Sequence, residues 1–188
     1  MNKRNVIIIA GLAIAAISWR IINHAYMLAP NLEIVTAVSV LAAMMIGWQA
    51  AIIVPIITMA VSDAIIGTSP IILFTWSCFA LIGASAVILK RLNHYPGRQL
   101  IGAAGFAIIS STLFFVVTNF GVWLQGFGFY YPSTLAGLGE SYMMGIPFYR
   151  TMLIGNLIIL PATIGVWQLV KAYRLASSKQ AVVTTIEK

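Results

Sequence analysis

Long apolar stretches, joined by short polar connections, constrain the fold of this chain more than any other feature of its sequence. Six of them follow one another, at residues 6–22, 34–47, 50–66, 70–89, 100–124 and 148–170. A helix needs about 20 predominantly apolar residues to cross the hydrocarbon core of a bilayer. The pattern therefore predicts an all-α membrane protein in the lipid bilayer, with six transmembrane helices in one domain over residues 1–188.

Charged residues are scarce throughout the chain. They make up 8% of it, against 61% hydrophobic residues, whereas soluble domains carry roughly 25% charged residues. A soluble enzyme, a nucleic-acid-binding domain and a disordered region are therefore excluded. The net charge of +7 is attributed to membrane topology, and no nucleic-acid partner is expected.

Lysine and arginine are distributed unevenly between the two sides of the predicted membrane. With a cytoplasmic N-terminus, nine of the eleven fall on the cytoplasmic side, as the positive-inside rule expects. They are Lys3, Arg4, Lys90, Arg91, Arg98, Lys171, Arg174, Lys179 and Lys188. We therefore expect both termini in the cytoplasm, 171–188 as a frayed cytoplasmic tail, and a location in the cell (plasma) membrane.

The first apolar stretch has two interpretations. Basic residues followed by an apolar run and small residues are typical of a signal peptide. The apolar pattern continues past Trp19 to Ile22, which favours a first transmembrane helix.

Polar and aromatic residues gather at the outer ends of the predicted helices and in the connection after the fifth. The candidate ligand-binding residues are Arg20, Asn31, Glu33, Asp63, Asn119, Trp123, Tyr131, Glu140 and Arg150. Ionisable groups in a membrane need a partner or a watery cavity. One interpretation of each charged residue taken alone is a structural ion pair, such as Arg20 with Glu33 or Arg150 with Asp63. The whole set of polar residues at one end favours a pocket for a small organic ligand instead.

The connection 125–147 is long for a helical bundle, and long loops are often lids or binding loops. Glycines and Pro132 interrupt it, and Ser133 or Thr134 is suited to cap a short helix that ends near Met144. The residues 145–147, Gly-Ile-Pro, then favour a break before the sixth helix. We expect a partly helical flap over the outer end of the bundle.

Absent motifs narrow the chemistry further. The chain has no G-x-x-x-x-G-K-[ST] motif for nucleotide phosphates, no H-E-x-x-H and no Cys/His cluster. No metal site, no cofactor and no enzymatic activity are therefore expected. A membrane enzyme that uses His24 and Asp63 stays a lesser alternative, since no nucleophile motif accompanies them.

Small residues line the first apolar stretch, among them Gly11 and Ala15, which lie four positions apart. Such a spacing lets another helix approach closely. The small residues of this stretch have two interpretations. They serve close packing within the chain, or they serve docking to another membrane subunit.

Several segments resemble an uncharacterised family of proposed membrane transport proteins. They are NLEIVTA at 31–37, VSDAIIG at 61–67, TNFGVWL at 118–124, YPSTLAGL at 131–138 and IPFYR at 146–150. The layout is more distantly similar to that of S-components, the substrate-binding subunits of energy-coupling factor transporters. That similarity implies six helices, a vitamin site near the outer face, and a first helix that docks a transmembrane coupling subunit served by separate ATPase subunits.

The chain departs from both patterns in places. A proline-containing segment usual in the first family is replaced by Ile-Ile-Asn-His at 21–24, and Pro30 is displaced. Asn2 stands where nickel and cobalt S-components have a histidine, so a metal-ion substrate is not expected.

The sequence thus favours the substrate-binding membrane subunit of an importer for a small, vitamin-like organic solute. The alternatives are a non-transporting subunit of a larger membrane complex and a membrane-embedded enzyme. The identity of the solute does not follow from the residues.

Overall fold

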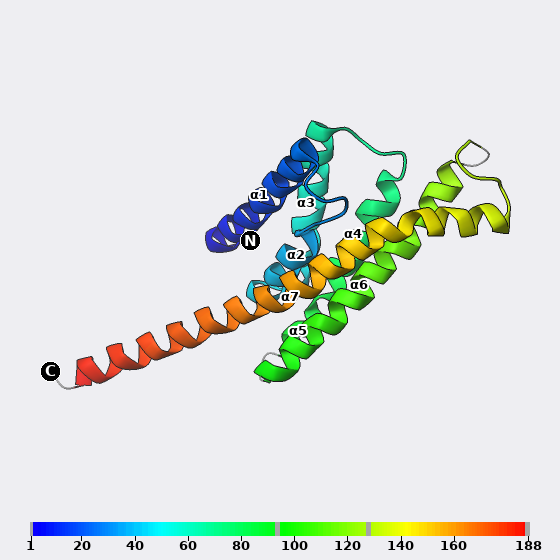
Figure 1. Cartoon of the computed structure of the whole chain (residues 1–188). Coiled ribbons are helices and arrows are strands. Elements are labelled where there is room, and N and C mark those ends of the chain that lie inside the picture. The colour runs from blue at the N-terminus through cyan, green and yellow to red at the C-terminus, as the bar shows by residue number, and fades with distance from the viewer. Residues whose placement is uncertain (1, 93–94, 127–128, 187–188) are drawn as a thin grey trace.

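The computed structural model describes residues 2–92, 95–126 and 129–186, and it describes side chains up to residue 178. Over this part of the chain the predicted all-α fold is confirmed, because helices account for the regular structure and no strand is present. The helices are α1 (Lys3–Tyr26), α2 (Val35–Met45), α3 (Trp48–Ile66), α4 (Ile72–Ser85), α5 (Val87–Arg91), α6 (Pro96–Gln125) and α7 (Leu135–Ile186) (Figure 1).

Among the described residues, five helical segments are long and apolar enough to cross a membrane. They are Lys3–Tyr26, Trp48–Ile66, Ile72–Arg91, Pro96–Gln125 and Leu135–Ser178. The predicted stretch 34–47 differs, because its helix α2 has only 11 residues. At 1.5 Å per residue it is about 16 Å long, roughly half the 30 Å of a hydrocarbon core.

The short helix α2 lies at the centre of the bundle. Nine of its eleven residues are buried, and it packs against α1, α3, α4, α5 and α7. Alanines at 37, 42 and 43 are fully or almost fully buried, since small side chains let neighbouring helices approach closely. The helix ends before Gly47, whose φ of 146° few other residues adopt, and α3 begins directly after it.

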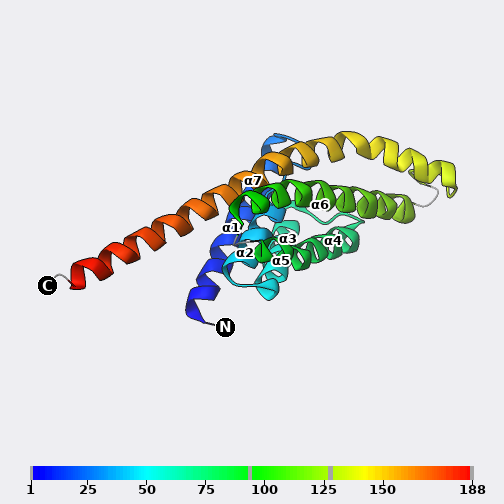
Figure 2. The same cartoon turned by 90° about the horizontal axis from the view of Figure 1, so that it is seen from below.

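The last two long helices form an antiparallel pair that extends past the start of α4 (Figures 1 and 2). With 30 and 52 residues, α6 and α7 are about 45 Å and 78 Å long. Both are therefore longer than the roughly 30 Å of the hydrocarbon core. We call residues 115–126 and 129–150 the α6–α7 hairpin.

The predicted break at Gly145-Ile146-Pro147 is wrong, because α7 is continuous from Leu135 to Ile186. A proline removes one backbone donor from a helix, but contacts with α6 hold the chain helical around it. The Ser141 hydroxyl donates to the Asn119 carbonyl at 2.8 Å, and the Tyr142 hydroxyl donates to the Val116 carbonyl at 3.1 Å. The expected flap is thus the first part of the last helix.

The structure describes residues 171–186 of the expected tail as the last part of α7, and fraying of this segment stays a prediction. Lys188 lies outside the described residues, and Lys179 belongs to the part whose side chains are not described.

The two ends of the bundle differ in charge. The start of α1, the α5–α6 region and the C-terminal third of α7 lie toward one end (Figure 1). This end, the cationic end, carries Lys3, Arg4, Lys90, Arg91, Arg98, Lys171 and Arg174. The opposite end, the loop end, is formed by the connections 27–34 and 67–71.

The positive-inside rule predicts that the cationic end faces the cytoplasm. In a Cys78→Ala background, cysteines replacing Gly97 or Ser178, both exposed, should resist a membrane-impermeant maleimide applied to intact cells. A cysteine replacing Ser133, exposed in the connection before α7, should react. Labelling after cell lysis controls for reactivity, and labelling of Gly97→Cys but not Ser133→Cys in intact cells would reverse the topology.

Candidate functional site

A cavity of about 620 Å³ opens at the loop end. Its wall is built from the end of α1, the connection 27–34, the end of α3, the connection after it, and α4, with one residue each from α6 and α7. Pockets that hold small molecules usually measure about 300–1,000 Å³. The cavity therefore has the size of a site for a small organic molecule.

The cavity exists because α2 is too short to fill the bundle from end to end. The irregular connection 27–34 occupies part of the remaining depth, and α1 holds its backbone. The Asn23 amide donates to the carbonyls of Ala29 and Leu32 at 3.0 Å and accepts from the Ala29 N–H at 3.0 Å. The Trp19 indole donates to the Leu32 carbonyl at 2.9 Å. Backbone without helical hydrogen bonds is tolerated inside membrane proteins where protein buries it or where it lines a cavity.

One charged cluster on the wall joins α1, α3 and α4. The Arg20 guanidinium donates from Nη2 to Asp63 Oδ1 at 2.5 Å and from Nε to the Ser62 hydroxyl at 2.7 Å. The second oxygen of Asp63 accepts from the Trp76 indole at 2.8 Å. Asp63 is only 7% exposed, so this ion pair is largely removed from water, where charged partners interact more strongly.

A second cluster holds Glu33 at the start of α2. Oε2 of Glu33 accepts from the Thr36 N–H at 2.8 Å, and Oε1 accepts from the Thr36 hydroxyl at 2.6 Å. The Asn156 amide of α7 also donates to Oε1, at 2.9 Å, and to the Ser111 hydroxyl of α6 at 3.2 Å. Glu33 therefore caps α2 and connects it to α6 and α7.

The deeper part of the wall is apolar. Met59, Phe79, Phe114 and Met152 line it, each at most 8% exposed in the whole structure. The rings of Phe79 and Phe114 lie 4.9 Å apart between centroids, a distance typical of favourable aromatic pairs. The cavity thus offers an apolar surface beside two polar clusters.

The structure brings four of the nine predicted ligand-binding residues onto this one wall. They are Arg20, Asn31, Glu33 and Asp63. Asn31 has a left-handed backbone, with φ of 58°, which asparagine tolerates better than most residues.

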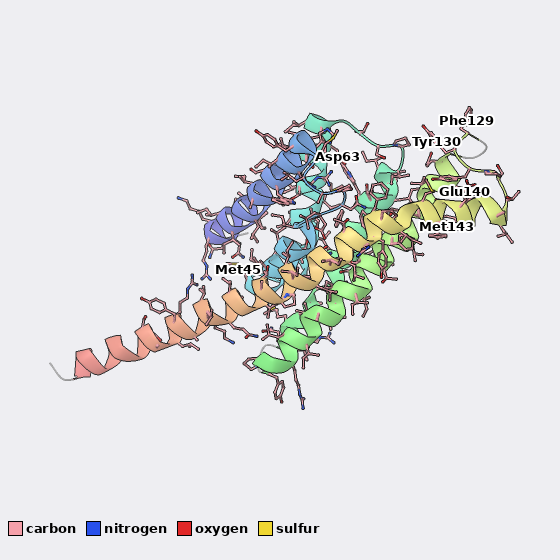
Figure 3. All side chains as sticks on the ribbon, in the orientation of Figure 1. Met45, Asp63, Phe129, Tyr130, Glu140 and Met143 are labelled. Atoms are coloured by element: carbon pink, nitrogen blue, oxygen red, sulfur yellow. The ribbon has the colours of Figure 1, made fainter. Side chains whose placement is uncertain are left out.

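The other five predicted residues lie on the α6–α7 hairpin and do not line the cavity. They are Asn119, Trp123, Tyr131, Glu140 and Arg150. The Asn119 amide donates to the Phe115 carbonyl at 2.8 Å and lies against the backbone at Gly145, and the Trp123 indole donates to the Pro132 carbonyl at 3.1 Å. Figure 3 places Glu140 on the hairpin, away from Asp63. Their role as ligand contacts stays a prediction, but a solute confined to the cavity does not reach them.

The two expected ion pairs are wrong in their partners. The structure records one ion pair among the residues it describes, and it joins Arg20 to Asp63. Glu33 does not pair with Arg20, because its carboxylate accepts hydrogen bonds from Thr36 and Asn156 instead. Arg150 is exposed on the hairpin.

Two amides that organise the site, Asn23 and Asn156, were not predicted from the sequence. Asn23 follows Trp19 by four positions, a spacing that places both on one helix face, and this signal was available. Asn156 is a lone amide within an apolar stretch, and polar residues in such stretches usually mark an interior contact. Neither position alone indicates its partner.

Metal ligands do not converge in the described part of the chain, where no three His, Cys, Asp or Glu residues are grouped to hold an ion. His24 lines the cavity mouth, and His94 lies outside the described residues.

Fold and site together define a class of protein: a helical protein with several helices of membrane-span length and a small-molecule-sized cavity at one end. The chain belongs to a family of unknown function, DUF6580, whose model matches residues 1–180. No curated protein and no solved structure matches the chain.

Breaking the Arg20–Asp63 pair should destabilise the fold. In Arg20→Met the Asp63 carboxylate stays buried without its cation, which we expect to lower the free energy of unfolding by about 3 kcal/mol. Thermal denaturation of the detergent-solubilised protein measures the effect. The control Arg150→Met removes an exposed arginine and should change stability by about 0.5 kcal/mol or less.

The double variant Arg20→Met/Asp63→Leu separates pairing from packing. It should recover part of the stability lost in Arg20→Met, because no charge is left unpaired. If the double variant loses as much free energy of unfolding as Arg20→Met and Asp63→Leu lose together, the two residues are not energetically coupled.

Proposed function

We propose that this chain is the substrate-binding membrane subunit of an importer for a small, vitamin-like organic solute. In this proposal it resides in the cell membrane, with six helices that include the short α2 and with both termini cytoplasmic. The solute binds from outside, in the cavity at the loop end.

The observation that carries the proposal is the cavity itself. It measures about 620 Å³, and it combines an apolar wall with Arg20, Glu33 and Asp63. A few polar groups on a mostly apolar wall are the usual means by which a protein orients a small molecule. A bundle with a purely structural role has no need to keep such a volume open beside buried charges.

The orientation of the chain supports uptake from outside. The positive-inside rule assigns the cationic end to the cytoplasm, and the cavity opens at the opposite end. A solute that enters the cavity therefore comes from the external side.

The source of energy must lie outside the chain in this proposal. The sequence contains no nucleotide-binding motif of the G-x-x-x-x-G-K-[ST] type. By the resemblance to S-components, a transmembrane coupling subunit and separate ATPase subunits supply it.

The surface of α1 supports docking of such a partner. Its packing against the bundle uses Ile9, Ala13 and Ala16, whereas Gly11 and Ala15 are exposed. A Cβ added at Gly11 meets no atom within 4 Å. Gly11 and Ala15 therefore remain accessible to a helix of another subunit.

The enzyme alternative has one supporting observation, since His24 and Asp63 line the same cavity. However, both oxygens of Asp63 already accept hydrogen bonds, from Arg20 and Trp76. No hydrogen bond joins His24 to Asp63 in the described part of the structure. Solute binding therefore accounts for the arrangement better.

Solute binding is tested by mass spectrometry of small molecules that co-purify with the solubilised protein, followed by titration of the molecule found. Phe79→Ala removes a ring from the cavity wall and should weaken binding by roughly 1–2 kcal/mol, the scale of burying part of a large side chain. The control Phe120→Ala removes a ring that is 40% exposed and should leave the dissociation constant within a factor of two.

Trp123→Ala decides between the cavity and the hairpin. If the solute binds only in the cavity, a correctly folded Trp123→Ala protein should bind it with unchanged affinity, because Trp123 does not line the cavity. Loss of affinity there, with Phe79→Ala unaffected, would move the site to the α6–α7 hairpin.

Docking through α1 predicts a separation of transport from binding. Gly11→Leu adds a large side chain to the exposed face of α1, about 13 Å along the helix from Arg20 at 1.5 Å per residue. Uptake by cells should fall, while solute affinity of the purified chain stays the same. Gly105→Leu on α6, where an added Cβ also meets no atom within 4 Å, serves as the control and should leave uptake unchanged.

The purified chain reconstituted alone in sealed vesicles should not concentrate the solute. Uphill, saturable accumulation without partners would contradict the importer-subunit proposal.

A further inference from the structure

We infer that the solute bound in this cavity is a small organic cation, with its charged nitrogen against the Glu33 carboxylate and its apolar part on the Met59, Phe79, Phe114 and Met152 wall. The inference rests on the proposed function, because it names the class of solute that the cavity takes.

The charges on the cavity wall do not balance. Arg20 contributes +1, and Glu33 and Asp63 contribute −1 each, so the wall carries −1 with His24 neutral. Arg20 and Asp63 neutralise each other in the ion pair that the structure records among its described residues. The remaining negative charge belongs to Glu33.

Glu33 is placed to receive a positive group. It is only 8% exposed, and it is one of the residues that line the cavity. Three donors, two on Thr36 and one on Asn156, occupy its oxygens. A carboxylate has about four acceptor directions, so one is left for a ligand.

The start of α2 favours a negative charge, and Glu33 accepts three hydrogen bonds there. Neither contact supplies a full positive charge, and burying a carboxylate without a cation is costly. A cationic solute offsets this cost when it enters, whereas an anion adds to it.

Arg20 is less suited to select an anion. Its Nε and one Nη2 hydrogen are directed to Ser62 and Asp63, and Asp63 cancels its charge at short range. The start of α2, which would otherwise attract an anion, is already occupied by Glu33.

The charge preference of the cavity is measurable without knowing the solute. Thr75 lines the cavity from α4 and is partly exposed. In a Cys78→Ala background, Thr75→Cys is treated with two reagents of similar size, the cationic 2-(trimethylammonium)ethyl and the anionic 2-sulfonatoethyl methanethiosulfonates. The rate constant for the cationic reagent is divided by that for the anionic reagent. This ratio is then divided by the same ratio for free 2-mercaptoethanol, which corrects for the intrinsic reactivity of the two reagents and gives the normalised ratio.

We expect the normalised ratio to favour the cation by on the order of tenfold, since a cleft of one charge sign concentrates the opposite ion to this extent. Glu33→Gln keeps a side-chain oxygen that can cap α2 but removes the charge, and should bring the ratio close to one. Glu140→Gln removes an exposed carboxylate from the hairpin and should leave the ratio unchanged. Thr68→Cys, at an exposed cavity position, gives an independent measurement and replaces Thr75→Cys if that variant does not fold.

Three results would overturn the inference: equal or faster reaction of the anionic reagent, a cation preference that survives Glu33→Gln undiminished, and a co-purified solute with net negative charge. These results are distinct from failure of the proposed function. A protein that binds no solute would contradict the importer role whatever the reagent ratio, whereas an anion preference contradicts only the class of solute.

Discussion

The burial of α2 is the constraint on which the rest of the structure depends. Its eleven residues lie against five other helices and reach about half the thickness of a hydrocarbon core. The remaining depth has to be filled by backbone that makes no helical hydrogen bonds. The connection 27–34 does so only because Trp19 and Asn23 of α1 satisfy its polar groups, and the space that it leaves is the cavity.

Two polar clusters border this space and hold the helices around it. Arg20, Ser62, Asp63 and Trp76 join α1, α3 and α4, and Glu33, Thr36, Ser111 and Asn156 join α2, α6 and α7. Hydrogen bonds to charged groups contribute about 1.5–3 kcal/mol each. A structural and a ligand-binding role are therefore compatible for the three charged side chains, because Arg20, Glu33 and Asp63 take part in these clusters and also line the cavity.

The α6–α7 hairpin shows how a local signal can be overruled by packing. Glycine and Pro147 favour a break near 145–147, yet the contacts of Ser141 and Tyr142 with α6 keep the helix continuous. Gly145 assists, because its lack of a side chain makes room for Asn119. As a result, the aromatic residues at the tip, such as Phe129 and Tyr130, extend away from the cavity and do not cover it (Figure 3).

The sequence by itself determined the helical class, the apolar segments, the cationic end and the gathering of Arg20, Asn31, Glu33 and Asp63 at the other end. These follow from hydropathy and charge, which are local properties of a chain that must satisfy its backbone within each segment. Only the tertiary structure decided the length of α2, the continuity of α7 and the partners of the buried charges. Glu33 and Asn156 lie 123 residues apart, and no local pattern indicates which distant donor will reach a carboxylate once the helices have packed.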